Sequence, residues 1–110
     1  MIATPMPLIH GSVIRCRPIG VLKMTDEAGD DSKVLAVPIE SVSKFHEKVR
    51  SHQDVQPALL ELITHFFEHY KDLEPNKWVT IDGWEGADAA ETEILESIER
   101  YDELPEKPHF

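Results

Sequence analysis

The chain has 110 residues, and 21 Asp and Glu against 11 Lys and Arg give it a formal net charge of −10. A chain of this length can form one domain around one core. It shows no cluster of Lys and Arg of the kind that binds a nucleic-acid backbone, and no apolar run long enough to span a membrane. The single cysteine, Cys16, excludes an internal disulfide and favours a reducing compartment. We therefore expect a cytoplasmic protein whose partners are neither nucleic acids nor membranes.

The first third of the chain predicts two strands. Residues 12–24 (SVIRCRPIGVLKM) are rich in β-branched side chains, and Pro18, which has no backbone donor, is expected at a bulge or an edge. Residues 33–38 (KVLAVP) predict the second strand, after an acidic turn. Residues 40–53 are polar and lack a period, so we expect a connecting segment with a short helical turn near 42–47.

A helix is predicted next. Asp54 is expected to cap it, and Pro57 is tolerated in its first turn. Its apolar residues recur at steps of three and four, which predicts one face in the core: Leu59, Leu60, Ile63, Phe66, Phe67 and Tyr70.

The last third predicts one more strand and one more helix. Residues 77–84 (KWVTIDGW) read as a strand with a bulge or a close approach at Gly83. Trp78 and Trp84 are expected on the same side of this strand, in the core. An amphipathic helix with an acidic outer face should follow, its apolar face formed by Ala90, Ile94, Leu95, Ile98 and Tyr101.

Three strands and two helices predict an α+β fold that is mainly β. A three-stranded sheet has two open edges, and the long first strand needs partners on both sides. We therefore expect residues 1–110 to form a single but incomplete domain, with a loose tail at 102–110, where two prolines and no apolar period occur.

The turn TDEAGDDSK is the first candidate for chemistry. Asp26, Glu27, Asp30 and Asp31 lie within it, and Lys33 ends it. Such carboxylates repel each other, and a hard cation such as Mg²⁺, which prefers carboxylate oxygen, would relieve the repulsion. A solvated turn between two strands is the alternative.

The segment HFFEHYK is the second candidate. His65, Glu68 and His69 have the spacing of a zinc-protease motif, because residues four apart lie on one face of a helix. Surface or interface histidines beside an apolar face are the alternative. Tyr70 and Lys71 could together hold a phosphate oxygen, although a lysine at a helix C-terminus is also favoured by the helix dipole.

Three segments, GSVIRCRPIGVLKMTDEAGDDSK, HFFEHYKDLE and KWVTIDGWEGADAAETEIL, resemble the later part of a family I soluble inorganic pyrophosphatase of the bacterial type. The resemblance runs from about residue 4 to residue 100. It implies a partial oligonucleotide-binding-like β-barrel of about three strands with two flanking helices. It also implies hydrolysis of pyrophosphate to two phosphates with several Mg²⁺ ions.

The resemblance also implies roles for individual residues. Asp26 and Asp31 match the two metal-binding aspartates of the hairpin turn. Lys33, Tyr70 and Lys71 match side chains that face the site or contact the phosphates of the substrate. Pyrophosphate is so anionic that an acidic pocket could bind it only through bridging cations, which agrees with these roles.

The same resemblance assigns His65 and His69 to a subunit interface, which implies a homo-oligomer and weakens the zinc interpretation. The DxDPxD motif of the family, which supplies further metal ligands and helps to activate water, does not occur in this chain. We therefore expect an N-terminally truncated pyrophosphatase with weak or no activity by itself. The alternative is a non-catalytic protein that self-associates through open sheet edges and the histidine face of its first helix.

Overall fold

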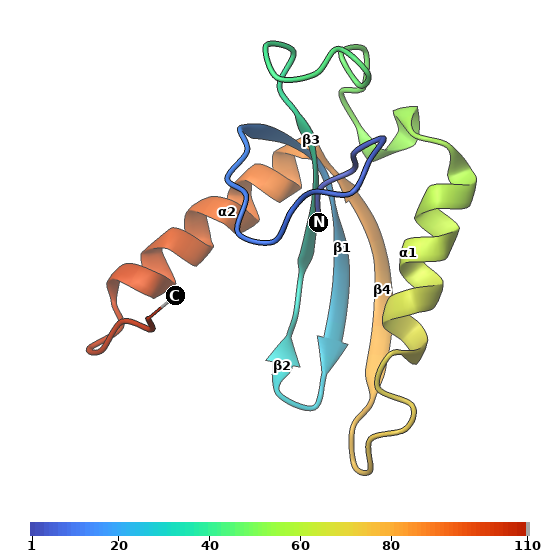
Figure 1. Ribbon diagram of the computed structural model, residues 1–110. Coiled ribbons are helices and arrows are strands. Elements are labelled where there is room, and N and C mark those ends of the chain that lie inside the picture. Colours follow the sequence, from blue (N-terminus) through green and yellow to red (C-terminus); the bar gives the residue numbers. More distant parts are fainter. Residues whose placement is uncertain (110) are drawn as a thin grey trace.

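The computed structural model describes residues 1–109 and shows an antiparallel sheet with a helix on either side of it (Figure 1). The elements follow in the order β1 (Cys16–Asp26), β2 (Gly29–Asp30), β3 (Lys33–Pro38), a 3-10 helix η1 (His52–Asp54), α1 (Pro57–His69), β4 (Val79–Gly86) and α2 (Ala87–Asp102). The mainly β fold with two flanking helices is therefore confirmed. The sequence missed β2, which has two residues.

β1 is the central strand and pairs with all three others. Its first part pairs with β3, its second part pairs with β4, and its last two residues pair with β2. The outer edge of β3 is covered by the first residues of the chain, since the Ala3 N–H donates to the Ala36 carbonyl over 2.9 Å. The expectation of two fully open edges is therefore wrong at β3. Within residues 1–109, β4 pairs with β1 alone.

Two bulges lie where the sequence predicts them. The β1–β3 register shifts between Pro18 and Gly20. The β1–β4 register shifts opposite Gly83, whose φ of +129° suits a residue without a side chain.

The second bulge changes the positions of the tryptophans. It adds one residue to β4, so the alternation of side chains reverses between Trp78 and Trp84. Trp84 packs on the core, whereas Trp78 is 51% exposed. The prediction that both lie on one side in the core is wrong, because it assumed regular strand alternation without a bulge.

The core lies between the sheet and α1. Its buried members are Ile19, Leu35, Val37 and Val55, and α1 contributes Leu59, Leu60 and Ile63 to it. The predicted apolar face of α1 is only partly confirmed, since Phe66 and Tyr70 are exposed. These two side chains extend past the small set of buried residues that α1 covers.

The segment between β3 and α1 is held by side chains rather than by regular structure. Asp54, expected to cap α1, instead accepts hydrogen bonds from the amides of Arg50 and Ser51 and completes a capping box for η1. The cap residue of α1 is Gln56, which makes no side-chain cap. The Arg17 guanidinium donates to the carbonyls of His46 and Val49 from β1.

Lys107 links the residues that follow α2 to the end of that helix. The Lys107 ammonium donates to the carbonyls of Asp102 and Leu104, over 2.9 and 2.7 Å. Phe110, the last residue of the predicted tail, lies outside the described residues. No helix of residues 1–109 has the length and apolar character needed to cross a membrane.

Candidate active site

The predicted site residues come from two parts of the chain that meet at one end of the sheet. Asp26 is the last residue of β1, and it pairs with Gly29 across a two-residue turn. Gly29 has a φ of +118°, a conformation that a residue with a side chain rarely adopts, so it suits this tight turn. Tyr70 and Lys71 follow the C-terminal end of α1.

Lys71 forms an ion pair with Asp26. Its Nζ lies 2.8 Å from Asp26 Oδ2, and the two side chains are only 13% and 10% exposed. Asp26 Oδ1 accepts a second hydrogen bond from the Ala28 N–H. The hydrogen bond from Lys71, followed by the one from Ala28, lowers the pKa of Asp26 below its ordinary value. The same hydrogen bond raises the pKa of Lys71.

Glu27 shares the same lysine. Both of its carboxylate oxygens lie 3.4 Å from Lys71 Nζ. A hydrogen bond from its own backbone amide and a further one from the Trp78 amide lower the pKa of Glu27. Glu27 reaches Lys71 because it lies in the turn, beyond the last strand residue, so strand alternation does not turn it away from Asp26.

A second ion pair stands beside the first. Lys33 Nζ lies 2.6 Å from Asp31 Oδ1, and the backbone amide of Asp31 donates to the Met24 carbonyl. The two side chains are 29% and 26% exposed, so this pair is more open to solvent than Asp26 and Lys71.

Aromatic rings connect the two ion pairs. Lys33 Nζ lies 5.5 Å from the centre of the Phe67 ring, and Phe67 meets Tyr70 edge to face with ring centres 5.5 Å apart. Lys71 Nζ in turn lies 5.5 Å from the Tyr70 ring, which is a cation–π distance. The structure thus joins the predicted metal-binding and substrate-binding residues in one line of contacts.

Two members of this line were not predicted as site residues. Phe67 was assigned to the core by its helical period, and that period carries no sign of its contact with Lys33. Glu27 stood in the acidic turn, but its link to Lys71 spans 44 residues and depends on the tertiary fold.

The site offers the kind of oxygen ligand that Mg²⁺ prefers. Asp26, Glu27 and Asp31 offer carboxylate oxygens from one hairpin, and lysine ammonium groups lie against all three. Two positive charges thus face three carboxylates, because Asp26 and Glu27 share Lys71. Among residues 1–109, however, no group of three or more His, Cys, Asp and Glu side chains is arranged as a metal site.

The two histidines lie on an exposed part of α1. Their ring centres are 4.4 Å apart, and His69 Nδ1 lies 2.9 Å from Asp72 Oδ2. His65 and His69 are thus neighbours on the helix surface, and neither belongs to the line of contacts around Lys71.

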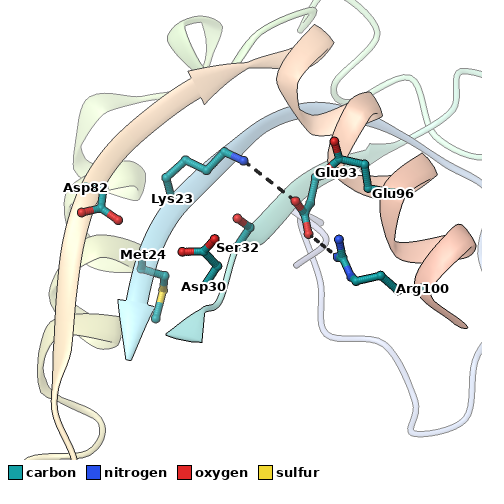
Figure 2. A pocket seen from close by; sticks show the side chains of 8 residues that line it. All are labelled: Lys23, Met24, Asp30, Ser32, Asp82, Glu93, Glu96 and Arg100. Atoms are coloured by element: carbon teal, nitrogen blue, oxygen red, sulfur yellow. Dashed lines mark hydrogen bonds and ion pairs between the residues drawn. The ribbon is translucent and has the colours of Figure 1, made fainter. Parts of the chain in front are cut away.

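A separate polar cavity of about 410 Å³ lies between the sheet and α2 (Figure 2). Asp30 and Asp82 line it together with Lys23, and Arg100 lies 2.9 Å from Glu93 Oε1. None of the predicted site residues lines this cavity. Asp30 and Asp31 are neighbours in sequence, yet only Asp31 pairs with Lys33.

Comparison with known proteins gives one consistent result. A family model described as inorganic pyrophosphatase matches residues 1–102. An inorganic pyrophosphatase of Yersinia pestis is 59% identical over 100 residues, and one of Escherichia coli K12 is 56% identical over the same length. Each match covers 91% of this chain and 57% of the relative.

Solved structures agree. An inorganic pyrophosphatase from Coxiella burnetii superposes with a TM-score of 0.86 at 49% identity, covering 91% of this chain and 60% of that one. The Helicobacter pylori inorganic pyrophosphatase gives 0.87 at 39% identity, covering 93% and 60%. The chain thus spans well under two thirds of the length of these relatives. On sequence and structure alike, it belongs to the inorganic pyrophosphatase family.

Proposed function

We propose that this chain carries the phosphate-binding side and part of the metal-binding side of a site that hydrolyses pyrophosphate to two phosphates with Mg²⁺. One observation carries the proposal: the two ion pairs and the aromatic rings between them form a single line of contacts in a member of this family. Asp26 and Asp31 are the proposed metal ligands. Lys33, Tyr70 and Lys71 are the proposed contacts to the substrate.

The residues divide the work by charge. Lys33 and Lys71 can donate to phosphate oxygens, and the Tyr70 hydroxyl can donate beside them. If the two ammonium groups turn toward the substrate, they release the carboxylate oxygens with which they pair in this structure. These oxygens can then bind a cation. Bound Mg²⁺ supplies positive charge that offsets the charge of the phosphates and acidifies water.

We propose that the 110-residue chain alone hydrolyses pyrophosphate only weakly. The resemblance assigns the water-activating carboxylate to the DxDPxD motif, which this sequence does not contain. General base catalysis is typically worth about 10² to 10⁴ in rate. Phosphate release in excess Mg²⁺ should therefore be slower by at least about 10² than for the complete Escherichia coli relative. Equal rates would overturn this part of the proposal.

Binding tests the site independently of turnover. Isothermal titration calorimetry of pyrophosphate in excess Mg²⁺ should show binding that Lys71→Met weakens about tenfold or more, since a charge-assisted contact to phosphate is lost. Lys48→Met, at an exposed lysine in the connecting segment, is the matched control and should bind like the unmodified chain. Equal affinities for the two variants would remove Lys71 from the site.

A second candidate is a non-catalytic, self-associating protein. Exposed apolar side chains on α1 favour it, with Leu62 at 69% and Phe66 at 57% exposure, close to the His65 and His69 face proposed as a subunit interface. Sedimentation velocity of the pure chain separates the two candidates. A homo-oligomer that binds no pyrophosphate supports this one, and a monomer that binds pyrophosphate rejects it.

The compartment is a proposal as well. The single cysteine and the acidic charge are consistent with a cytoplasmic protein, and nothing in the proposed site calls for an oxidising environment.

A further inference from the structure

Phe67 contacts two of the proposed substrate-binding residues, one from each part of the chain that builds the site. Lys33 Nζ lies 5.5 Å from the centre of its ring, and the Tyr70 ring meets it edge to face at the same distance between centres. Lys33 is the first residue of β3, whereas Tyr70 follows α1. Phe67 thus joins the hairpin side of the site to its helix side.

The helical period places Phe67 next to the site. Tyr70 and Lys71 come three and four residues later, so the three side chains are neighbours on the helix surface. The residues that α1 contributes to the core lie one to two turns earlier, at Leu59, Leu60 and Ile63. Phe67, which is half-buried, thus comes after the residues that form the core and beside those that form the site.

Lys33 has a second contact, of a different kind. Its ammonium group pairs with Asp31 Oδ1 over 2.6 Å, and Asp31 is a proposed metal ligand. A carboxylate neutralises an ammonium group, whereas the face of an aromatic ring attracts it and leaves its charge and N–H donors available. Lys33 loses its carboxylate partner when Asp31 binds a cation, but the ring stays in place. Phe67 is therefore the contact that Lys33 can keep while it binds phosphate.

We propose that Phe67 is a positioning residue, whose ring holds the Lys33 ammonium group where it can donate to a phosphate oxygen of pyrophosphate. The edge-to-face contact with Tyr70 fixes the ring in turn, and so ties the lysine to the tyrosine. The inference rests on the proposed function, because it concerns the same site. It adds a residue to which neither the sequence motifs nor the ion pairs give a role.

Calorimetric titration of pyrophosphate in excess Mg²⁺ tests the inference on the purified 110-residue chain. Phe67→Leu removes the ring but keeps an apolar side chain. It should weaken binding about twofold to fivefold, which is the effect of losing one cation–π contact near the surface. Phe67→Tyr keeps the ring and should bind like the unmodified chain. Phe45→Leu is the matched control, because it removes a phenylalanine of the connecting segment that is 70% exposed.

A double-mutant cycle shows whether Phe67 acts through Lys33. In the background of Lys33→Met, Phe67→Leu should cause no further loss of affinity, because the ammonium group is already absent. An undiminished further loss would overturn the inference. So would equal affinities for Phe67→Leu and Phe45→Leu, or a Phe67→Tyr variant that binds as weakly as Phe67→Leu. Absence of binding by the unmodified chain is a different result, which rejects the proposed function and this inference with it.

A spectroscopic measurement needs no variant and so covers a Phe67→Leu chain that does not fold. Protons over the face of an aromatic ring are shielded, so the Lys33 Cε protons should resonate upfield of those of Lys48, an exposed lysine of the connecting segment. This shift should persist at saturating pyrophosphate and excess Mg²⁺. Its loss on binding would show that Lys33 leaves the ring to reach the substrate, and would overturn the inference.

Discussion

Asp26 is a largely buried carboxylate whose charge is balanced by one ammonium group from a distant part of the chain. Removing one partner of such a pair leaves the other charge without compensation, which is usually more harmful than replacing both. Lys71 therefore has two roles in our interpretation. It neutralises Asp26 in the free protein, and it contacts phosphate in the proposed complex.

The pH dependence of stability should reveal this pair. The pKa of Asp26 is lowered in the folded state, so its contribution is present above the ordinary value of about 4 and is lost as the pH falls through the folded value. The pKa of Lys71 is raised, so its contribution is present below about pH 10 and is lost above it. Urea midpoints should therefore form a plateau between these limits.

Lys71→Met should lower that plateau and flatten its acid limb. With the lysine removed, the pKa of Asp26 should rise toward its ordinary value, so less stability is left to lose in acid. Urea midpoints measured from pH 7 to pH 3 check this, with Lys48→Met as the control. Parallel acid limbs for Lys71→Met and the unmodified protein would contradict it.

Asp31 and Asp30 offer a direct comparison of neighbouring carboxylates. Asp31→Asn should weaken Mg²⁺-dependent binding of pyrophosphate by about tenfold or more, because a proposed ligand loses its charge. Asp30→Asn should not, since Asp30 lines the cavity on the α2 side. Calorimetric titrations at fixed Mg²⁺ measure both. A larger effect at Asp30 would show that the metal ligands are wrongly assigned.

At the scale of elements, Gly20 is a point where the backbone of β1 comes close to η1 and β4. A Cβ added there would lie 2.8 Å from the Cβ of His52 and 3.1 Å from the Glu85 carbonyl oxygen. His52 in turn stacks on Trp84, with ring centres 5.8 Å apart, and Trp84 Nε1 donates to Thr64 Oγ1 of α1. Gly20 thus sets how closely η1, β4 and α1 pack.

Gly20→Ala should destabilise the protein by about 1–3 kcal/mol, the usual cost of overpacking a filled site. Gly86→Ser is the control, because a Cβ at Gly86 meets nothing within 4 Å and serine suits its position as the N-cap of α2. Urea denaturation followed by tryptophan fluorescence measures both. A neutral Gly20→Ala would mean that η1 moves away at little cost.

The elements show how far local sequence carries. Alternation and helical periods predicted three strands and both helices, because those patterns are fixed by backbone geometry. The prediction that both tryptophans face the core is wrong because the β4 bulge opposite Lys23 reverses the alternation of side chains between them. The sequence assigned Asp54 to α1 because an acidic residue shortly before Pro57 is typical of a helix cap. The same residue type also suits the short 3-10 helix η1, and Asp54 caps η1 instead.

The site shows the same limit. Asp31 and Lys33 are two residues apart, and both lie in the acidic turn that the sequence singles out as a candidate site. Asp26 and Lys71 are 45 residues apart, and only the resemblance to a family indicated that they belong together. Glu27 was missed as a partner of Lys71 for the same reason.

At the scale of the whole molecule, exposed apolar faces coexist with a strongly acidic surface. The charge of −10 opposes contact between copies at neutral pH, and this repulsion vanishes near the isoelectric point of about 4.9. Self-association should therefore increase as the pH falls from 7 toward 5. Sedimentation velocity across this range measures it, and a pH-independent monomer would show that the exposed apolar side chains of α1 do not drive contact between copies.

The central position of β1 also favours one order of folding. β1, β2 and β3 follow one another along the chain and can close as a local hairpin, whereas the contact between Thr25 and Asp82 spans 57 residues. Short loops close at a smaller entropic cost, so the hairpin should form first and β4 should dock later. During synthesis the edge of β1 that pairs with β4 should therefore stay unpaired until β4 has left the ribosome. An unpaired strand edge invites pairing with another chain, so we expect strand exchange to be most frequent in that interval.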